Sequence, residues 1–296
     1  MSTSLPTGRG SGSVGAVVAM SDLDRTLIYS PSALMLPGPD EQAPRLVCVE
    51  VYQGRPLSFV TETAAGALEE LAATGMFVPT TTRTVEQYRR IRMPGPAPRL
   101  AVCANGGRLL VDGVEDEDFT TVLDSKLDSC APHDEVFAEL TRLADPGDGP
   151  QFVEKIRTAS SLFCYAVVHR AQLPTGWLEH VAGFAGERGW GVSMQGRKVY
   201  LVPNLLSKSA AAAEVAERLG ADTVVAAGDS LLDAELLEAA HWAIRPAHGE
   251  LADTGWDRRH VSVTTVSGVA AGEQIATWLL EQVQSGQVGP SLTQVG

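Results

Sequence analysis

The sequence predicts an α/β protein with a doubly wound, mostly parallel sheet and a smaller inserted α/β unit. An unbroken apolar run at 14–20, rich in Val and Ala, stops abruptly at a pair of acids. Such a run is typical of a strand covered on both faces, as in a parallel sheet. Strand and helix patterns alternate in residues 14–111 and again in 197–283, which favours a parallel sheet with crossover helices. The more acidic and polar block at 112–196 breaks this alternation and predicts the insertion.

The first part of the predicted core begins with the apolar strand and continues through a Pro-rich loop. Residues 46–51 and 57–60 alternate around a Gly-containing turn, which predicts a hairpin that forms a flap near the acid pair. Ala64, Leu68 and Leu71 share one helical face, and Gly75 follows at a C-cap position. The expected elements are a strand at 14–20, a loop at 29–44, the hairpin, a helix at 61–74, a strand at 76–79, a helix at 85–91, and a second hairpin at 100–104 and 108–111.

The insertion and the second part of the core follow in the same way. Ser207 is a good N-cap for a helix that Gly220 ends. We expect a Gly/Ser-rich disordered leader at 1–13 and a flexible polar tail at 284–296. The insertion is predicted to hold helices at 134–143 and 177–188 and strands within 160–169, at 190–194 and at 199–202; the core resumes with a helix at 210–219, a strand at 223–227, a helix at 231–240, strands at 242–244 and 261–265, and a helix at 269–283.

Composition narrows the class of partner. The formal net charge of −13 argues against a nucleic-acid partner or an anionic membrane, because either would be repelled. No apolar run reaches the roughly 20 residues that cross a bilayer. The 4 cysteines have no metal-site spacing, so we expect free thiols in a reducing compartment and a cytoplasmic location. The sequence does not indicate an oligomeric state.

Four polar clusters stand where predicted strands end or helices begin. In an α/β sheet the carboxyl ends of parallel strands border the ligand crevice, so these clusters are expected to meet. Carboxylates at three of the positions would form a hard oxygen site suited to Mg²⁺, with a hydroxyl and an ammonium left to hold phosphate oxygens. The clusters are Asp22/Asp24/Thr26, Thr81/Thr82/Arg83, Lys208, and Asp229/Asp233.

Each cluster has a structural alternative. The first acid pair could form a surface turn, and Asp233 could cap a helix through the Ser230-x-x-Asp233 pattern. The threonines could be ordinary strand-end residues. Lys208 lies in the first turn of a helix, where the dipole disfavours a cation by up to about 1 kcal/mol. A nearby anion would explain it, although a solvated lysine is the alternative, and Lys198 is a rival that borders a predicted strand.

The order D-x-D-x-T, a hydroxyl after a short strand, Lys at a helix start, and G-D-x-x-x-D resembles the haloacid dehalogenase superfamily of phosphotransferases. The resemblance implies a Rossmann-like core with a cap. The position of the insertion is similar to the branch with a large α/β cap, which includes Cof-like sugar phosphatases, sucrose-phosphate phosphatases, mannosyl-phosphoglycerate phosphatases and phosphomannomutases. The turn at 105–107 resembles the N-G-A turn before that cap. Two positions depart from the family pattern, since Arg25 stands where Gly is usual and Leu232 where Asn is common.

The resemblance implies a Mg²⁺-dependent phosphatase that acts on a small phosphorylated metabolite, with a sugar phosphate as the expected substrate. Alternatives are a phosphomutase on the same scaffold and a binding protein that kept the fold. The implied nucleophile is Asp22, which forms an aspartyl-phosphate, and the implied general acid/base is Asp24. Mg²⁺ is implied to bind to the Asp22 side chain, the Asp24 backbone carbonyl and Asp229, with Asp233 in support. The implied phosphate-binding residues are Thr81 and Lys208. Substrate contact is implied for Arg25, Thr82, Arg83 and Asn105 and, from the cap, for Glu154, Lys155 and Arg157.

Overall fold

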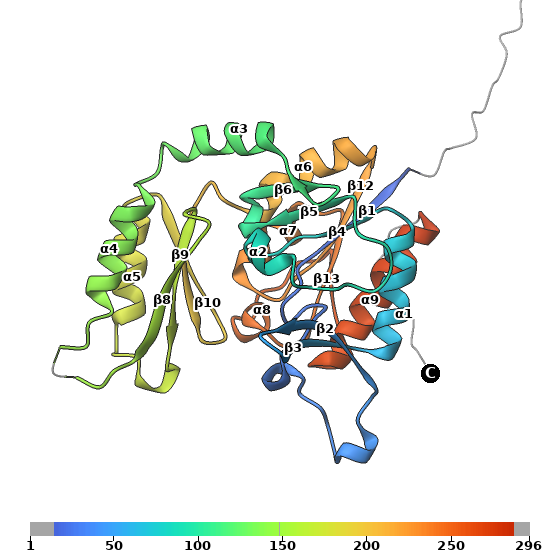
Figure 1. Ribbon diagram of the computed structural model, residues 1–296, viewed down its shortest axis with the longest axis horizontal. Coiled ribbons are helices and arrows are strands. Elements are labelled where there is room, and N and C mark those ends of the chain that lie inside the picture. Colours follow the sequence, from blue (N-terminus) through green and yellow to red (C-terminus); the bar gives the residue numbers. More distant parts are fainter. Residues whose placement is uncertain (1–14, 148, 287–296) are drawn as a thin grey trace, which may run out of the picture.

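The computed structural model describes residues 15–147 and 149–286. The predicted leader at 1–13 and residues 287–296 of the predicted tail lie outside this range. Figure 1 shows two parts side by side, a larger α/β part and a smaller one that contains α4, α5 and β8–β10. No helix in the described ranges is both long and apolar enough to cross a membrane.

The larger part is built on a five-stranded sheet in the order β14-β13-β12-β1-β4, and every pairing in it is parallel. This confirms the predicted fold class. β1 is an interior strand between β12 and β4 and is buried along its whole length, because its side chains are covered on both faces. The strands are β1 Val17–Ser21, β4 Phe77–Pro79, β12 Thr223–Ala227, β13 Trp242–Arg245 and β14 Val261–Val263.

Helices cover both faces of this sheet. On one face, α1 (Glu62–Ala73) and α9 (Val269–Ser285) pack together against the odd residues of β1, and both views show them side by side. On the other face lie α6 (Lys208–Leu219) and α7 (Ala234–Ala239). α9 continues into the predicted tail as far as Ser285. The short helices α2 Val85–Tyr88 and α8 Glu250–Asp253 lie in connections.

Two smaller sheets flank the core. The predicted flap is present as an antiparallel hairpin, β2 Leu46–Tyr52 and β3 Arg55–Thr61. The second predicted hairpin, β5 Leu100–Cys103 and β6 Arg108–Val111, gains a third strand, β7 Val114–Glu115. The predicted loop at 29–44 contains two 3₁₀ turns, Pro31–Ala33 and Asp40–Gln42.

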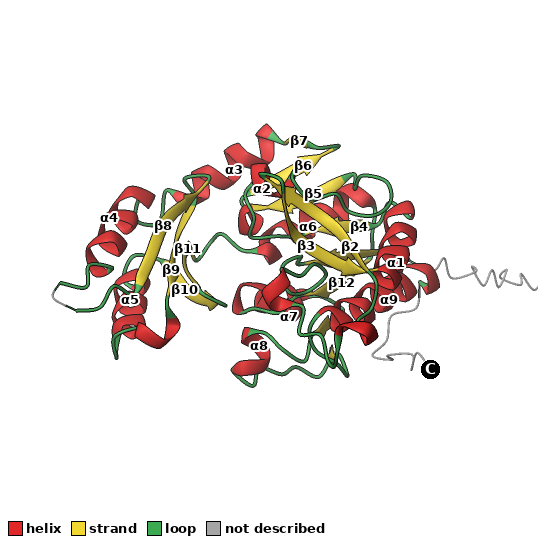
Figure 2. Ribbon diagram, turned by 60° about the horizontal axis from the view of Figure 1, so that its bottom comes forward, coloured by secondary structure: helices red, strands yellow, loops and turns green. Residues whose placement is uncertain are grey.

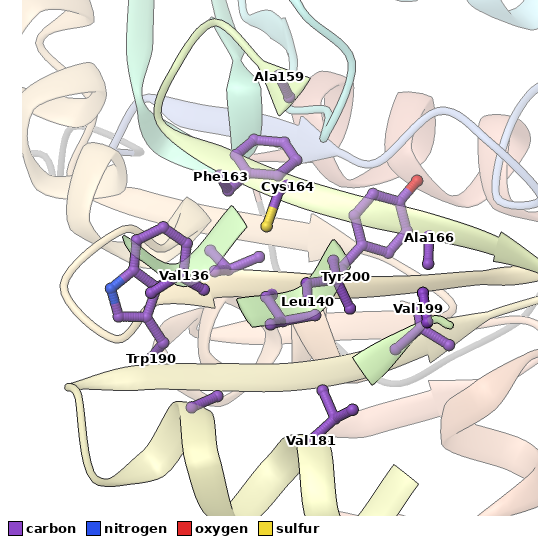
Figure 3. Packing of buried hydrophobic residues seen from close by; sticks show 14 of the residues in the cluster. Val136, Leu140, Ala159, Phe163, Cys164, Ala166, Val181, Trp190, Val199 and Tyr200 are labelled. Atoms are coloured by element: carbon purple, nitrogen blue, oxygen red, sulfur yellow. The ribbon is translucent and has the colours of Figure 1, made fainter. Parts of the chain in front are cut away.

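The inserted part is a four-stranded antiparallel sheet in the order β10-β11-β9-β8. Two helices pack on it, and their side chains Val136, Leu140 and Val181 belong to the same buried cluster as Phe163 and Trp190 of the sheet (Figure 3). A further helix, α3 Glu117–Leu127, connects the two parts (Figure 1). The elements are β8 Val153–Ala159, β9 Phe163–Val168, β10 Trp190–Gln195, β11 Lys198–Pro203, α4 His133–Leu143 and α5 Trp177–Gly186.

The expected return to the core at residue 197 is wrong by one strand. β11 pairs with both β10 and β9, so Lys198–Pro203 lies inside the inserted sheet. The strand at 199–202 was itself expected in the insertion, so the inserted sheet agrees with that expectation and only the boundary at 196/197 differs. α3 and β8 were not expected at all. We propose that the insertion runs from α3 to the end of β11.

Candidate active site

Three of the predicted metal-binding acids meet at the carboxyl ends of the neighbouring strands β1 and β12. β1 and β12 are parallel neighbours in which Ser21 pairs with Ala227, so the residues that follow each strand emerge together. The Asp22 backbone N–H extends this ladder by donating to the Ala227 carbonyl at 2.9 Å. Carboxylate oxygens of Asp22, Asp229 and Asp233 all lie within 4.8 Å of one another, and all three residues are buried.

Lys208 joins this cluster from the start of α6. Its Nζ donates to Asp22 Oδ1 at 2.6 Å and to Asp233 Oδ1 at 2.5 Å, and the side chain is fully buried. Burial alone would lower the pKa of Lys208, but the two carboxylates raise it above its ordinary value. The lysine is therefore an ammonium ion held among acids, and the solvated alternative is wrong. The predicted N-cap, Ser207, accepts from the Ala210 N–H and fixes the start of the helix.

Asp233 fits both interpretations of its motif. Its Oδ2 accepts from the backbone N–H of Asp229 and of Ser230 and from the Ser230 hydroxyl at 2.7–3.1 Å, so it caps the turn, while Oδ1 binds Lys208. Gly228 allows this close approach, because a Cβ there would lie 2.3 Å from the Asp233 Cβ. With both oxygens engaged, Asp233 positions the loop and Lys208.

The cluster carries more negative charge than its one lysine compensates. Burial raises the pKa of Asp22 to about 7 against the opposing effect of Lys208. Burial, with the neighbouring Asp22 and Asp233, raises the pKa of Asp229 well above its ordinary value. The nearest cation to the Asp229 carboxylate is Arg25, whose Nε lies 3.3 Å away without forming a hydrogen bond. A buried, oxygen-only and under-compensated set of this kind fits Mg²⁺.

Arg25 adds a second cation beside the cluster. Its Nε lies 3.3 Å from Asp229 Oδ2, and the guanidinium is about one-third exposed. Its backbone has a φ of 65°, the left-handed conformation that glycine adopts most easily. His248 Nε2 lies 3.0 Å from the Arg25 carbonyl and helps to hold the loop.

Asp24, the second acid of the first motif, faces away from Lys208 and toward Arg83. Arg83 donates from Nε and Nη2 to the two Asp24 oxygens at 2.7 and 2.8 Å, and from Nη1 to Glu50 Oε2 at 2.9 Å. Burial alone would raise the pKa of Asp24, but the Arg83 guanidinium lowers it below its ordinary value. Glu50 lies on the flap, where the Ser58 hydroxyl also donates to it at 2.7 Å. Sequence analysis did not identify Glu50.

The predicted threonines have different surroundings. Thr26 Oγ1 donates to Asp22 Oδ2 at 3.1 Å. Thr81 is buried at the end of β4, and its hydroxyl accepts from the Arg83 N–H at 3.1 Å. Thr82 lines the cavity beside Asp24. Thr26 is thus the threonine that the structure places in contact with Asp22.

Asn105 lies in the turn that packs against the segment leading into Lys208. Its amide donates to the Leu206 carbonyl at 2.9 Å, and it does not line the Asp24 cavity. The adjacent Gly106 packs so tightly that a Cβ would lie 2.1 Å from the Ser207 carbonyl oxygen. Contact of Asn105 with a substrate stays a prediction.

A cavity of 270 Å³ lies between the Asp24 side of the core and the inserted sheet. The predicted cap contacts Glu154, Lys155 and Arg157 are absent from its lining and belong to the solvated edge of β8. The charged residues in the lining are Asp24, Glu50, Arg83, Arg90 and Lys198, and the aromatic ones are Phe163, Tyr165 and Tyr200. Of these, Glu50, Arg90 and the three aromatic residues were not identified from the sequence.

The fold and the acid cluster define a capped, Rossmann-like α/β protein. No family model matches the sequence, and no curated protein matches it either. Among solved structures, the chain is similar to the sucrose-phosphatase of Synechocystis sp. PCC6803 in complex with sucrose and phosphate, with a TM-score of 0.58, 16% identity, and 92% of this chain and 98% of that one covered. The chain has the fold of the haloacid dehalogenase superfamily.

Other structures show the same likeness. A protein from Thermoplasma acidophilum gives a TM-score of 0.57 at 12% identity, with 91% of this chain and 99% of that one covered. A sugar phosphatase described as a member of haloacid dehalogenase subclass IIB gives 0.52 at 11% identity, with 91% and 98% covered. The predicted resemblance is thereby confirmed at the level of the fold.

Proposed function

We propose that the protein is a Mg²⁺-dependent phosphatase that hydrolyses a small phosphorylated metabolite, a sugar phosphate, through an aspartyl-phosphate. The observation that carries the proposal is the convergence of Asp22, Asp229 and Asp233 around the buried Lys208 at the end of β1. The likeness to a sucrose-phosphatase and to a subclass IIB sugar phosphatase supports the same class of substrate.

In the first step, an Asp22 oxygen attacks phosphorus and the bond to the leaving oxygen breaks. Asp24 gives a proton to that oxygen as it leaves. In the second step, Asp24 takes a proton from a water molecule, which attacks phosphorus, releases inorganic phosphate and restores the Asp22 carboxylate. Because Arg83 holds Asp24 ionised in the free protein, its action as an acid requires that bound substrate weaken this ion pair.

The remaining groups stabilise charge. Mg²⁺, when bound, would neutralise the repulsion between the anionic nucleophile and the anionic phosphate. Asp22, the Asp24 backbone carbonyl and Asp229 would hold it, with Asp233 in support. Lys208 pairs with Asp22 in the free protein and is positioned to donate to the phosphoryl oxygens, together with Thr81. Loss of one such fixed donor costs about 3–4 kcal/mol of barrier in comparable sites.

The proposal is tested by replacing the nucleophile. We expect Asp22→Asn to reduce phosphate release by at least about 10³-fold, because an amide cannot form the covalent intermediate. Phosphate release from p-nitrophenyl phosphate and from a panel of sugar phosphates, with and without Mg²⁺, measures this. Asp222→Asn is the matched control, since Asp222 is exposed at the opposite end of β12. Full activity of Asp22→Asn would contradict the proposal.

The same panel separates the alternatives. A phosphatase releases inorganic phosphate from a sugar monophosphate without any added sugar bisphosphate, whereas a phosphomutase returns the phosphate to the sugar. A binding protein releases none from any ester. Each outcome gives a different ratio of released phosphate to isomerised sugar phosphate.

A further inference from the structure

The cavity beside Asp24 holds more positive charge than its own acids compensate. Three cations and two acids line it. Both acids are already paired with one cation, since Arg83 contacts Asp24 at 2.7 and 2.8 Å and Glu50 at 2.9 Å. Arg90 from the core and Lys198 from the insertion bring the net charge of these five side chains to +1.

Arg90 follows α2 and faces the cavity with its hydrogen-bonding capacity unused. Its Nε is buried and has no hydrogen-bond partner among the described residues. The nearest carboxylate oxygen, Glu50 Oε1, is 3.8 Å away, and Glu50 is held by Ser58 and Arg83. The guanidinium instead rests 4.4 Å from the centre of the Tyr52 ring. Stacking of this kind orients a guanidinium and leaves its donors free for a ligand.

Lys198 begins β11 on the opposite wall. Lys198 is exposed, and its ammonium sits 5.4 Å from the Tyr165 ring centre and 5.9 Å from that of Tyr200. Tyr200 first, and then Asp24, raise the pKa of Lys198 above its ordinary value, so it stays charged. The preceding Arg197 lies on the other side of the strand and pairs with Glu154 at the surface.

We infer that Arg90 and Lys198 bind an acidic group on the leaving group of the substrate, a carboxylate or a second phosphate. This inference rests on the proposed phosphatase function. A neutral sugar in this cavity would cover the half-buried Arg90 and the exposed Lys198 and desolvate one net positive charge without adding a counter-charge, which is unfavourable. An acidic group between the two walls supplies that charge, and Phe163, Tyr165 and Tyr200 provide an apolar surface for the carbon skeleton. The 270 Å³ volume is near the lower end of the range for small-molecule pockets, which suits one sugar unit.

The experiment compares three six-carbon phosphate esters that carry no further acid, a carboxylate or a second phosphate: glucose 6-phosphate, the open-chain 6-phosphogluconate, and glucose 1,6-bisphosphate. We expect kcat/KM for at least one acidic ester to exceed that for glucose 6-phosphate by tenfold or more. Lys198→Gln and Arg90→Gln should each remove most of this preference while changing glucose 6-phosphate turnover less than threefold. Arg197→Gln removes a neighbouring cation at the surface and should leave the preference for the acidic ester unchanged. Preference for 6-phosphogluconate means that Arg90 and Lys198 bind a carboxylate, and preference for the bisphosphate means that they bind a second phosphate.

A binding measurement separates this inference from the proposed function. Titration calorimetry of the same three esters into Asp22→Asn with Mg²⁺ measures the affinity of each ester without turnover. Preferential binding of an acidic ester that Lys198→Gln abolishes supports the subsite, even if the wild-type protein hydrolyses nothing and the phosphatase proposal fails. Equal binding of the three esters, or a loss in Lys198→Gln that is the same for all of them, overturns the inference even if the protein is a phosphatase.

Discussion

At the scale of single residues, Arg25 combines an unfavourable backbone conformation with a charge beside the acid cluster. A φ of 65° costs a residue with a Cβ about 1–2 kcal/mol relative to the right-handed region. His248 contacts the Arg25 carbonyl and holds this conformation. The Arg25 guanidinium lies 3.3 Å from the Asp229 carboxylate. A cation so placed compensates part of the acid charge and opposes the binding of a metal ion at the same carboxylates.

We therefore expect Arg25→Gly to bind Mg²⁺ about fivefold more tightly. Removing one charge a few ångströms from the site is worth about 1 kcal/mol when the charge is partly solvated. Calorimetric titration with Mg²⁺ measures the change. Arg25→Lys keeps both the charge and the strained backbone and serves as the control. Unchanged or weaker Mg²⁺ binding in Arg25→Gly would show that the guanidinium does not act on the cluster.

At the scale of elements, the start of α3 connects the insertion to the core. Asp116 is the N-cap of this helix, and its Oδ1 accepts from the Phe119 N–H at 2.7 Å. Its Oδ2 accepts from Arg218 Nη1 of α6 at 2.5 Å. The Phe119 N–H first, and then Arg218, lower the pKa of Asp116 below its ordinary value of 3.8. One carboxylate thus caps one helix and joins it to another.

We expect Asp116→Ala to lower the free energy of unfolding by about 1 kcal/mol at pH 7, the usual value of an N-cap. Because the folded-state pKa of Asp116 is lowered, the ionised group stabilises the fold above pH 3.8, and this contribution is lost as the pH falls through the lowered value. The difference between the wild type and the variant should therefore shrink at low pH. Urea unfolding from pH 7 down to about pH 2.5, which is below the ordinary value of an aspartate, measures it.

The control for this prediction is Asp118→Ala. Asp118 is exposed in the same first turn of α3 and interacts with the helix dipole but does not cap it. An equal loss of stability in both variants would mean that the dipole, and not the cap, accounts for the effect.

Elements with a strong local signal were predicted from the sequence. β1 was recognisable from its continuous apolar run, and α6 from its Ser207 cap and its terminal Gly220. α3 and β8 gave little signal, because α3 buries Leu123 as its one fully buried residue and β8 buries only its two ends. Their positions depend on contacts with other elements, which a periodicity in one segment does not reveal.

Part of the candidate site could likewise be predicted from the sequence and part could not. The meeting of Asp22 and Asp229 could be predicted, because parallel strands end at one edge of a sheet. The Glu50–Arg83–Asp24 network could not, since Glu50 lies where the register of the flap shifts on both sides of it. Such an irregularity turns a side chain away from the simple alternation. The feature that distinguishes Glu50 is its burial within a hairpin, and burial cannot be read from the sequence.

At the scale of the whole molecule, a contact between the two parts holds the inserted sheet against the core. Glu250 of α8 accepts from the Ser193 hydroxyl at 2.9 Å and from the Met194 N–H at 3.0 Å, both on β10. The same carboxylate accepts from the Leu231 N–H at 2.9 Å, beside the Asp229 loop. Gln195 adds a hydrogen bond to Ser230. The position of the insertion is thereby coupled to the loop that carries the acids.

We expect Glu250→Ala to favour an open arrangement of the two parts. Two hydrogen bonds across the contact contribute about 2 kcal/mol, which corresponds to roughly a 30-fold rise in the open population. Small-angle scattering should report a larger radius of gyration, and KM should rise because closure must be restored on binding. Asp253→Ala, an exposed position on the same short helix, is the control. Identical scattering and KM in both variants would mean that this contact does not govern closure.

The junction at Asn105 and Gly106 has a consequence for how such proteins diversify. There the chain departing for the insertion touches the chain coming back, through the Asn105 amide on Leu206 and the tight packing of Gly106 on Ser207. Lys208 begins immediately after this junction, so a change in the inserted part need not move Lys208 relative to Asp22 and Asp233. If the protein is the phosphatase proposed above, its substrate preference can then change through the insertion while the acid cluster stays as it is.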